Sequence, residues 1–199
     1  LKLNTMKKQI FLAITALTVV FYSFTVVTNT EWTNDTAHSK LGFSVTHMMI
    51  SDVEGYFKKV NIKLITTKPD FADAVVEVTA DVASINTDNE KRDGHLQSED
   101  FFDAAKYPVI TFKSTSFKKG KTAGTYVVKG NLTMHGVTKP VTLTAVAKTG
   151  VHPMSKKSIA GFKISGTVKR SDFAIGGSTP TAIVGDEVTI NANAEFSKN

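Results

Sequence analysis

A strict alternation of apolar and polar residues constrains the fold of this chain more than any other feature. Apolar residues occupy every second position of 76–82, with glutamate, threonine and aspartate between them. The stretches 160–168 and 188–196 alternate in the same way. Successive side chains of a β-strand point to opposite faces, so each stretch predicts a strand with one buried face and one solvent-facing face.

The same pattern recurs from Leu41 to Phe196 and predicts about eight strands. They cover residues 41–49, 52–64, 74–86, 108–117, 124–133, 138–149, 159–171 and 183–197. Parity breaks between Phe57 and Val60, which predicts a β-bulge near Lys58 and Lys59. Long strands in succession favour an all-β, eight-stranded antiparallel up-and-down barrel over a sandwich. Eight strands enclose a lumen that holds side chains or one slim ligand.

The segment 87–107 differs from the strands because its residues do not alternate. It carries charges together with scattered apolar residues such as Leu96, Phe101 and Phe102. We expect one or two short helices here. Pro108 then begins the next strand, a position at which its missing N–H group is tolerated.

The chain length fits one domain. Its 199 residues contain no linker rich in proline, glycine or serine, and 41% are hydrophobic against 21% charged, as in ordinary globular proteins. No cysteine is present. A disulfide framework, a thiolate metal site and a cysteine nucleophile are therefore excluded, and packing must hold the fold.

The N-terminal segment is typical of a secretory signal. Lys7 and Lys8 follow Met6, the expected translation start, and precede the uncharged apolar run from Ile10 to Val27. We expect residues 1–28 to be a signal peptide and 29–199 to be a periplasmic or secreted domain. A clear cleavage site is absent, and an apolar run of about 18 residues approaches the length of a membrane span, so an uncleaved anchor is the alternative.

The basic charge does not indicate a nucleic-acid partner. Half of the formal net charge of +6 comes from Lys2, Lys7 and Lys8 in the N-terminal segment. The other lysines are spread along the chain, with clusters at 118–121 and 156–157 beside glycine or serine. Such clusters are typical of solvated hairpin tips, whereas a phosphate-binding face needs contiguous basic residues with interleaved aromatics.

The chain resembles the YceI-like family, whose members are exported lipocalin-like barrels associated with the binding of polyisoprenoids and other lipids. The resemblance covers about Trp32 to Phe196 and departs at Ala174, where the family more often has glycine. The matching stretches are Trp32, Ala37-His38-Ser39, Phe43 to Met48, Gly55, Phe57, Asn86-Thr87, Arg92 to Leu96, Asp100 to Asp103, Lys106-Tyr107-Pro108, Thr111 to Ser114, Gly130 to Val141, Arg170 to Phe173 and Val184-Gly185-Asp186.

Catalytic and metal signatures are missing from the sequence. The histidines at positions 38, 47, 95, 135 and 152 have no H-x-x-x-H or HExxH spacing, and the family resemblance implies no metal. No G-x-S-x-G elbow accompanies the serines. We therefore expect no enzyme activity, no metal and no cofactor, and we expect His135 to have a structural role in a tight turn.

Two arginines have two interpretations. Arg92 and Arg170 each precede an aspartate within one or two positions, in segments that leave the strand pattern. As ligand-binding residues they would hold an anionic or amide head group at the barrel mouth, because the guanidinium fork suits phosphate and carboxylate. As structural residues they would organise the loops, and this second interpretation is favoured.

The inward faces of the strands predict the ligand site. Apolar alternation alone would suit a solid core, but the family resemblance and small inward residues such as Ala145, Ala192 and Ala194 favour a hollow lumen. The residues expected to contact the ligand, chosen by parity and bulk, are Phe43, Val45, Phe57, Val78, Ile110, Phe112, Leu132, Phe162, Ile164, Val188 and Ile190.

The leading hypothesis is therefore an exported carrier or sequestering protein that binds one long-chain isoprenoid or other lipid in the lumen. The first alternative is a solidly packed envelope stress protein that acts through protein contacts. The second is a lipid-modifying enzyme. A homodimer and a transient membrane contact are left open.

Overall fold

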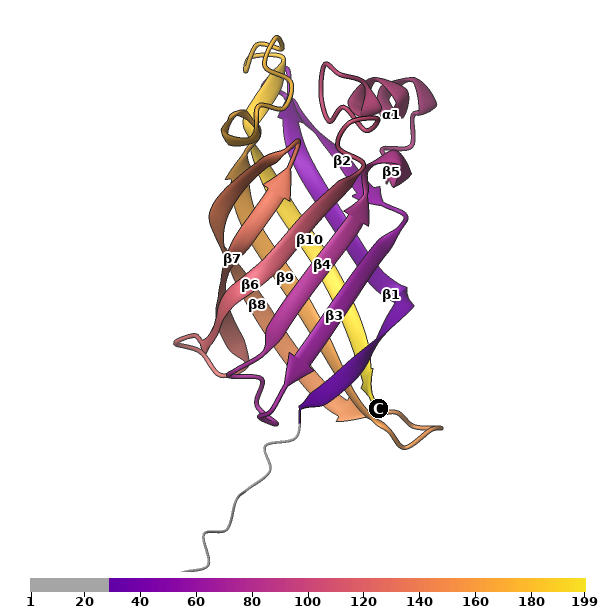
Figure 1. The fold of residues 1–199 in the computed structure, drawn as a ribbon, viewed down its shortest axis with the longest axis vertical. Coiled ribbons are helices and arrows are strands. Elements are labelled where there is room, and N and C mark those ends of the chain that lie inside the picture. Colours follow the sequence, from indigo (N-terminus) through magenta and orange to yellow (C-terminus); the bar gives the residue numbers. More distant parts are fainter. Residues whose placement is uncertain (1–28) are drawn as a thin grey trace, which may run out of the picture.

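A closed eight-stranded antiparallel barrel forms the body of the protein (Figure 1). The computed structural model describes residues 29–199, so the predicted signal segment 1–28 lies outside the described residues. Closure comes from β1, which pairs with β10 from Trp32–Lys198 to His47–Val184. The predicted up-and-down barrel is confirmed. Its strands are β1 Thr30–His47, β2 Ser51–Phe57, β3 Val60–Thr66, β4 Val75–Asp81, β6 Val109–Lys119, β7 Thr125–Met134, β8 Val137–Val151, β9 Ser158–Lys169 and β10 Val184–Lys198.

Two consecutive strands, β2 and β3, share one position in the barrel wall. They are separated at Lys58 and Lys59, where the sequence predicted a bulge. β2 pairs with residues 41–47 of β1, whereas β3 pairs with the first residues of β1, including Trp32 with Leu64. The pair therefore acts as a single bent strand, and the bend helps the sheet to close.

Two predicted strand boundaries were wrong. β1 begins at Thr30 rather than at 41, because a register shift between Asp35 and Lys40 interrupts the alternation that would have marked it. The predicted strand 74–86 is broken by a 3₁₀ turn, η1 Val82–Ser84, in which the Asp81 carboxylate accepts the N–H of Ala83. The remaining piece, β5 Ile85–Asn86, pairs with β2.

One α-helix, α1 Glu90–Gln97, lies in the predicted helical segment, and the Asn89 side chain caps it by accepting the N–H of Arg92. Segment 87–108 with α1 and the β9–β10 connection, which contains η2 Arg170–Phe173, lie at the same end of the barrel (Figure 1). We call this the α1 end. In the described part of the chain, no helix has the length and apolar character needed to span a bilayer.

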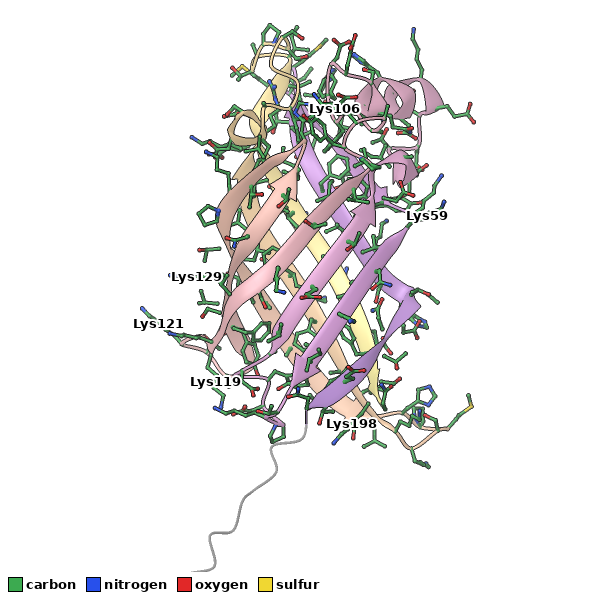
Figure 2. All side chains as sticks on the ribbon, in the orientation of Figure 1. Lys59, Lys106, Lys119, Lys121, Lys129 and Lys198 are labelled. Carbon is green, nitrogen blue, oxygen red and sulfur yellow. The ribbon has the colours of Figure 1, made fainter. Side chains whose placement is uncertain are left out.

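The lysines are distributed along the outside of the barrel (Figure 2). Lys106 lies at the α1 end, Lys129 beside the middle of the wall, and Lys119 and Lys121 at the opposite end. Lys121 lies in the β6–β7 turn, and Lys156 and Lys157 lie in the β8–β9 connection. The described surface therefore places these charges far apart rather than on one contiguous basic face.

Candidate ligand-binding cavity

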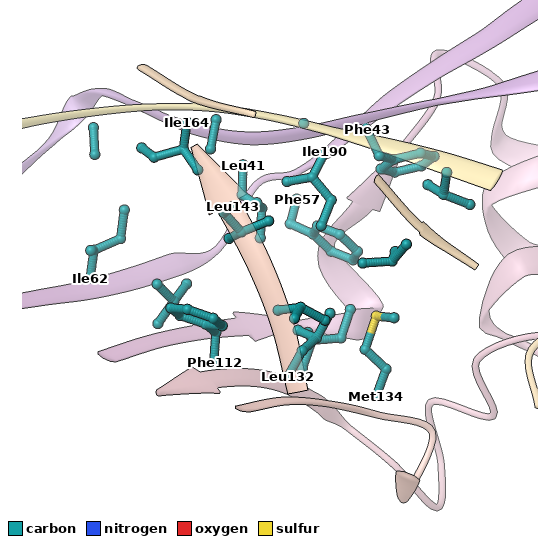
Figure 3. Close-up of a pocket in the computed structure, with 18 of the residues that line it drawn as sticks. Leu41, Phe43, Phe57, Ile62, Phe112, Leu132, Met134, Leu143, Ile164 and Ile190 are labelled. Carbon is teal, nitrogen blue, oxygen red and sulfur yellow. The ribbon is translucent and has the colours of Figure 1, made fainter. Parts of the chain in front are cut away.

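The barrel encloses an apolar cavity of about 220 Å³. Figure 3 shows side chains from opposite walls, among them Phe43, Ile190, Phe112 and Leu132, pointing toward one another across it. An apolar cavity of roughly 150 Å³ is already large enough for a benzene-sized guest. Among the described residues that line it, Arg170 is the only one with an ionisable side chain. The cavity therefore suits an apolar ligand.

All eleven apolar residues predicted for the lumen lie on the cavity wall, and so does Arg170. Arg92 is not among the lining residues. Contact of any of them with a ligand stays a prediction. Further residues that the sequence did not predict as ligand contacts also line the cavity, and they are Leu41, Gly42, Ile62, Leu64, Val76, Leu96, Phe101, Phe102, Phe117, Val128, Met134, Val141, Leu143, Val168, Ile175, Val184 and Phe196.

Some inward-facing side chains of the wall are only half-buried, whereas others, such as Phe112, Leu132 and Leu143, are buried. Val78, Ile164 and Ile190 point inward yet keep part of their surface accessible, as residues facing a hollow do. A solid core would bury such side chains fully, because protein interiors are close-packed. Small residues contribute as expected, since Ala145, Ala192 and Ala194 belong to the lining.

Some glycines leave space that a side chain of a neighbouring strand fills, so they do not enlarge the lumen. A Cβ at Gly130 would come within 2.4 Å of the Phe112 ring, and one at Gly166 would come within 2.4 Å of Leu143. These large side chains therefore lie flat over the glycines and shape the cavity wall. The glycines were not separable from other small inward residues in the sequence, because the contact crosses between strands.

The cavity is long and narrow. β10 contributes lining residues from Val184 to Phe196. At a rise of roughly 3.4 Å per residue this stretch is on the order of 40 Å long. With a strand tilt of roughly 35–45° the lined region extends about 30 Å along the barrel axis. That shape fits an extended chain better than a compact molecule.

The end of the barrel opposite α1 is closed by an aromatic cluster around Phe71. This residue lies in the β3–β4 loop, is buried, and places its ring 5.2 Å from the rings of both Trp32 and Phe162, measured between centroids. The loop is fastened because the Tyr126 hydroxyl donates to the carbonyl of Asp70 at 2.7 Å. Phe162 lines the cavity, so the cluster packs against the cavity wall at this end.

A carboxylate organises the same β3–β4 loop. Asp73 accepts hydrogen bonds from the hydroxyls of Thr66 and Thr67 and from the backbone amides of Thr67 and Lys68. Burial acts to raise the pKa of Asp73, but these four hydrogen bonds outweigh it and lower the pKa from 3.8 to about 2. Because the folded pKa lies below the unfolded one, Asp73 stabilises the fold above about pH 4 and loses this effect as the pH falls toward 2.

Replacing Asp73 by asparagine is therefore expected to destabilise the barrel in a pH-dependent way. At pH 7 we expect a loss of about 1 kcal/mol, after allowing for solvent screening of this half-buried group. The loss should shrink between pH 4 and pH 2, where the wild-type carboxylate becomes protonated. Chemical denaturation across this pH range measures it, with Glu99→Gln on the exposed surface as the control. A difference that is independent of pH would contradict the assignment.

At the α1 end, two chain segments cover the cavity and touch each other. Leu96, Phe101 and Phe102 reach the cavity from the α1 segment, and Ile175 reaches it from the β9–β10 connection. The two segments meet where Phe101 packs against Gly176, whose added Cβ would lie 2.8 Å from the ring. The cover at this end therefore consists of connecting segments and not of barrel strands.

Arg170 holds the β9–β10 connection in place. The residue is 6% exposed, and its guanidinium donates to the carbonyls of Gly185, Ile175, Gly176, Thr179 and Val184 at 2.5–3.2 Å. These bonds use all five N–H donors of the group. In this arrangement no donor is left for a ligand head group, which favours the structural interpretation of Arg170.

Arg92 has a corresponding local role at α1. Its guanidinium donates to the hydroxyl and the carbonyl of Thr87 at 2.8 and 2.6 Å. The neighbouring Asp93 accepts the N–H and the hydroxyl of the same Thr87. Arg92 and Asp93 thus both hydrogen-bond to Thr87 and attach α1 to the end of β5. A contact of Arg92 with a ligand head group stays a prediction.

The histidines also form local contacts. His135 lies in the β7–β8 turn with Gly136, and both have positive φ angles, 49° and 73°. Its ring nitrogen lies 3.2 Å from the carbonyl of Phe173, and the ring packs edge-on against Tyr107. This turn therefore links to the β9–β10 connection, in agreement with the structural role expected for His135.

Outside the barrel, Asp35, His38 and Glu195 bring potential metal-ligating atoms within 4.8 Å of one another. The hydrogen bond with His38 lowers the pKa of Asp35, and the same bond raises the pKa of His38. Asp35 also accepts the backbone amides of Ala37 and His38, so the pair shapes the bulge in β1. Spacing could not reveal this group, because Glu195 comes from the paired strand β10.

Comparison with known proteins identifies the family. Residues 32–196 match the YceI-like domain. The protein belongs to the YceI-like family. Two curated relatives are UPF0312 proteins of Staphylococcus aureus, from strains N315 and MSSA476, and both are 35% identical over 174 residues, covering 84% of this chain and 98% of the relative.

Solved structures agree with this membership. BcnA of Burkholderia cenocepacia has a TM-score of 0.73 at 28% identity and covers 82% of this chain and 99% of its own. The YceI protein of Campylobacter jejuni has a TM-score of 0.71 at 35% identity, covering 77% and 90%. A polyisoprenoid-binding domain from Saccharophagus degradans has a TM-score of 0.59 at 16% identity, covering 87% and 99%, and shows the fold alone.

One departure from the YceI-like pattern has a backbone explanation. Ala174 follows η2 and has a φ of 55°, in the left-handed region where glycine is free of strain. Its N–H bonds to the carbonyl of Ser171 at 3.1 Å and ends the turn. In this YceI-like chain alanine adopts a left-handed conformation that glycine would adopt with less strain.

Proposed function

We propose that this YceI-like protein binds one long-chain isoprenoid or other lipid in the barrel lumen and acts as an exported carrier or sequestering protein. The observation that carries the proposal is the long apolar cavity. Arg170, the one ionisable residue among the described residues that line it, already donates its N–H groups to backbone carbonyls. The family membership supports a binding protein. The Saccharophagus degradans domain of the same fold is described as polyisoprenoid-binding, which is the ligand class that the cavity fits.

The energetics select long ligands. Burial of each CH₂ group contributes about 0.8 kcal/mol, so a sixteen-carbon chain gains on the order of 12 kcal/mol. Association costs roughly 4–15 kcal/mol. For a short chain the free energy of burial is therefore smaller than the cost of association. The protein should bind small apolar solutes only weakly.

Export and the non-catalytic role belong to the same proposal. The basic residues at 7–8 and the apolar run after them favour an extracytoplasmic location, where an insoluble lipid needs a soluble carrier. An enzyme would need an ionisable group at the ligand with a free proton donor or acceptor, and Arg170 offers neither. The alternative of a solidly packed barrel is disfavoured by the half-buried inward side chains.

A chain-length series tests the proposal. Saturated fatty acids from eight to eighteen carbons should displace a fluorescent long-chain fatty acid with affinity that rises about fourfold per CH₂. The rise should stop when the chain fills the lumen. Isothermal calorimetry or fluorescence displacement measures it. An affinity that does not depend on chain length would contradict binding in the lumen.

A further inference from the structure

The turn between β1 and β2 presents three consecutive apolar side chains to solvent. Met48, Met49 and Ile50 are 55%, 77% and 85% exposed. Met48 and Met49 have φ angles of 51° and 62°, in the left-handed region. Asparagine and glycine are the residues that such a conformation favours. Formation of the turn therefore does not explain why two methionines and an isoleucine occupy it.

The turn adjoins the cavity at the α1 end. The N–H of Met48 donates to the carbonyl of Ile183 at 2.9 Å, and the following Val184 lines the cavity. On the other side, Val45 of β1 also lines the cavity. Ile183 is itself 43% exposed, so apolar surface continues from the tip of the turn to the cavity edge.

The size and charge of this surface indicate its partner. Three side chains on a narrow tip expose on the order of a few hundred Å². A stable protein interface needs roughly 800 Å² on each side. Insertion into a bilayer needs only the apolar tip, which can enter the boundary between head groups and acyl chains. The charged side chains nearest in β2 are exposed Asp52 and Glu54, so the tip itself carries no basic residue that would attract anionic lipids.

We propose that Met48, Met49 and Ile50 insert into the surface of a lipid bilayer, so that the α1 end of the barrel faces the membrane when ligand enters or leaves. The inference rests on the proposed function, because it supplies the step by which an insoluble lipid moves between membrane and lumen. Zwitterionic lipid is sufficient for this contact, because the inserting side chains are apolar.

The absence of cysteine allows a site-specific test in the full chain. An Ile50→Cys variant carries an environment-sensitive fluorophore at the tip, and Met154→Cys is the matched control. Met154 is 83% exposed in the β8–β9 connection at the opposite end. On addition of phosphatidylcholine vesicles, the label at position 50 should brighten and shift to the blue while the label at 154 does not respond. Equal responses at both positions, or none at 50, would overturn the inference.

A second measurement separates this inference from the proposed function. Met49→Asn/Ile50→Ser should slow uptake of a fluorescent fatty acid from vesicles by about tenfold, because the two most exposed of the three inserting side chains are lost. Its equilibrium affinity for the same fatty acid in solution should match that of the wild type. Unchanged uptake by this variant would overturn membrane docking and leave ligand binding intact. A tip that inserts in a protein that takes up no fatty acid would overturn the proposed function instead.

Discussion

Replacing Ile164 by glutamate is expected to abolish ligand binding while the domain stays folded. Ile164 lies mid-strand in β9, lines the cavity and is only half-buried. Its pairing neighbours are Ala145 on β8 and Ala192 on β10, which leave space beside it. A carboxylate at this position can keep some water in the hollow, so destabilisation should be about 1–2 kcal/mol.

The same carboxylate is incompatible with an acyl chain in the lumen. We expect the affinity for a long-chain fatty acid to fall at least about a hundredfold, because a buried charge beside apolar CH₂ groups would be neither solvated nor paired. Denaturation and fluorescence titration measure the two effects. Ser165→Glu, on the outward face of the same strand, is the matched control.

Each alternative outcome of this substitution has a distinct meaning. In a solidly packed barrel the carboxylate would lose all water, and the cost of several kcal/mol would approach the whole stability of about 5–15 kcal/mol. An unfolded Ile164→Glu variant would therefore contradict the hollow barrel. A folded variant with unchanged affinity would contradict a ligand contact at Ile164.

Replacing Arg170 by methionine is expected to have the largest effect on stability. The substitution removes five hydrogen bonds to backbone carbonyls and leaves buried acceptors without donors. We expect a loss of about 3–5 kcal/mol and a fall in Tm of roughly 10 °C or more. Arg170→Lys should rescue only part of the loss, because lysine has three donors and no planar fork. Arg92→Met, which loses two hydrogen bonds to Thr87, should cost less.

The Arg170 variants also test the head-group interpretation. If the guanidinium serves only the β9–β10 connection, Arg170→Lys should bind a long-chain fatty acid and the corresponding alcohol in the wild-type affinity ratio. A selective loss of the fatty acid would instead show that Arg170 holds the carboxylate. Thermal unfolding and paired titrations provide both measurements on the same samples.

The sequence predicted the barrel well because alternation directly reports the two faces of a strand. The bend at Lys58 and Lys59 was also predictable, since a bulge shifts parity. Residues 30–40 were missed because the register shift between Asp35 and Lys40 removes the alternation that identifies a strand. The local sequence pattern therefore predicts the regular strands of the barrel wall but not the irregular segments at its edges.

The two ends of the cavity were less predictable than its wall. Phe71 lies in a loop without periodicity, and its inward direction depends on a φ of 56° and on contacts with distant strands. The five acceptors of Arg170 come from carbonyls, which carry no side-chain signal. Leu41 and Ile62 line the cavity, as the alternation of their strands allows. They were nevertheless not among the predicted ligand contacts.

Native mass spectrometry of the protein, purified gently from the cells that produce it, shows whether a lipid occupies the lumen. The hollow apolar lumen predicts one additional mass per chain that corresponds to a single long-chain lipid and is absent from Ile164→Glu. A protein that carries only the polypeptide mass, and that takes up no long-chain lipid when saturated with it, would contradict the account.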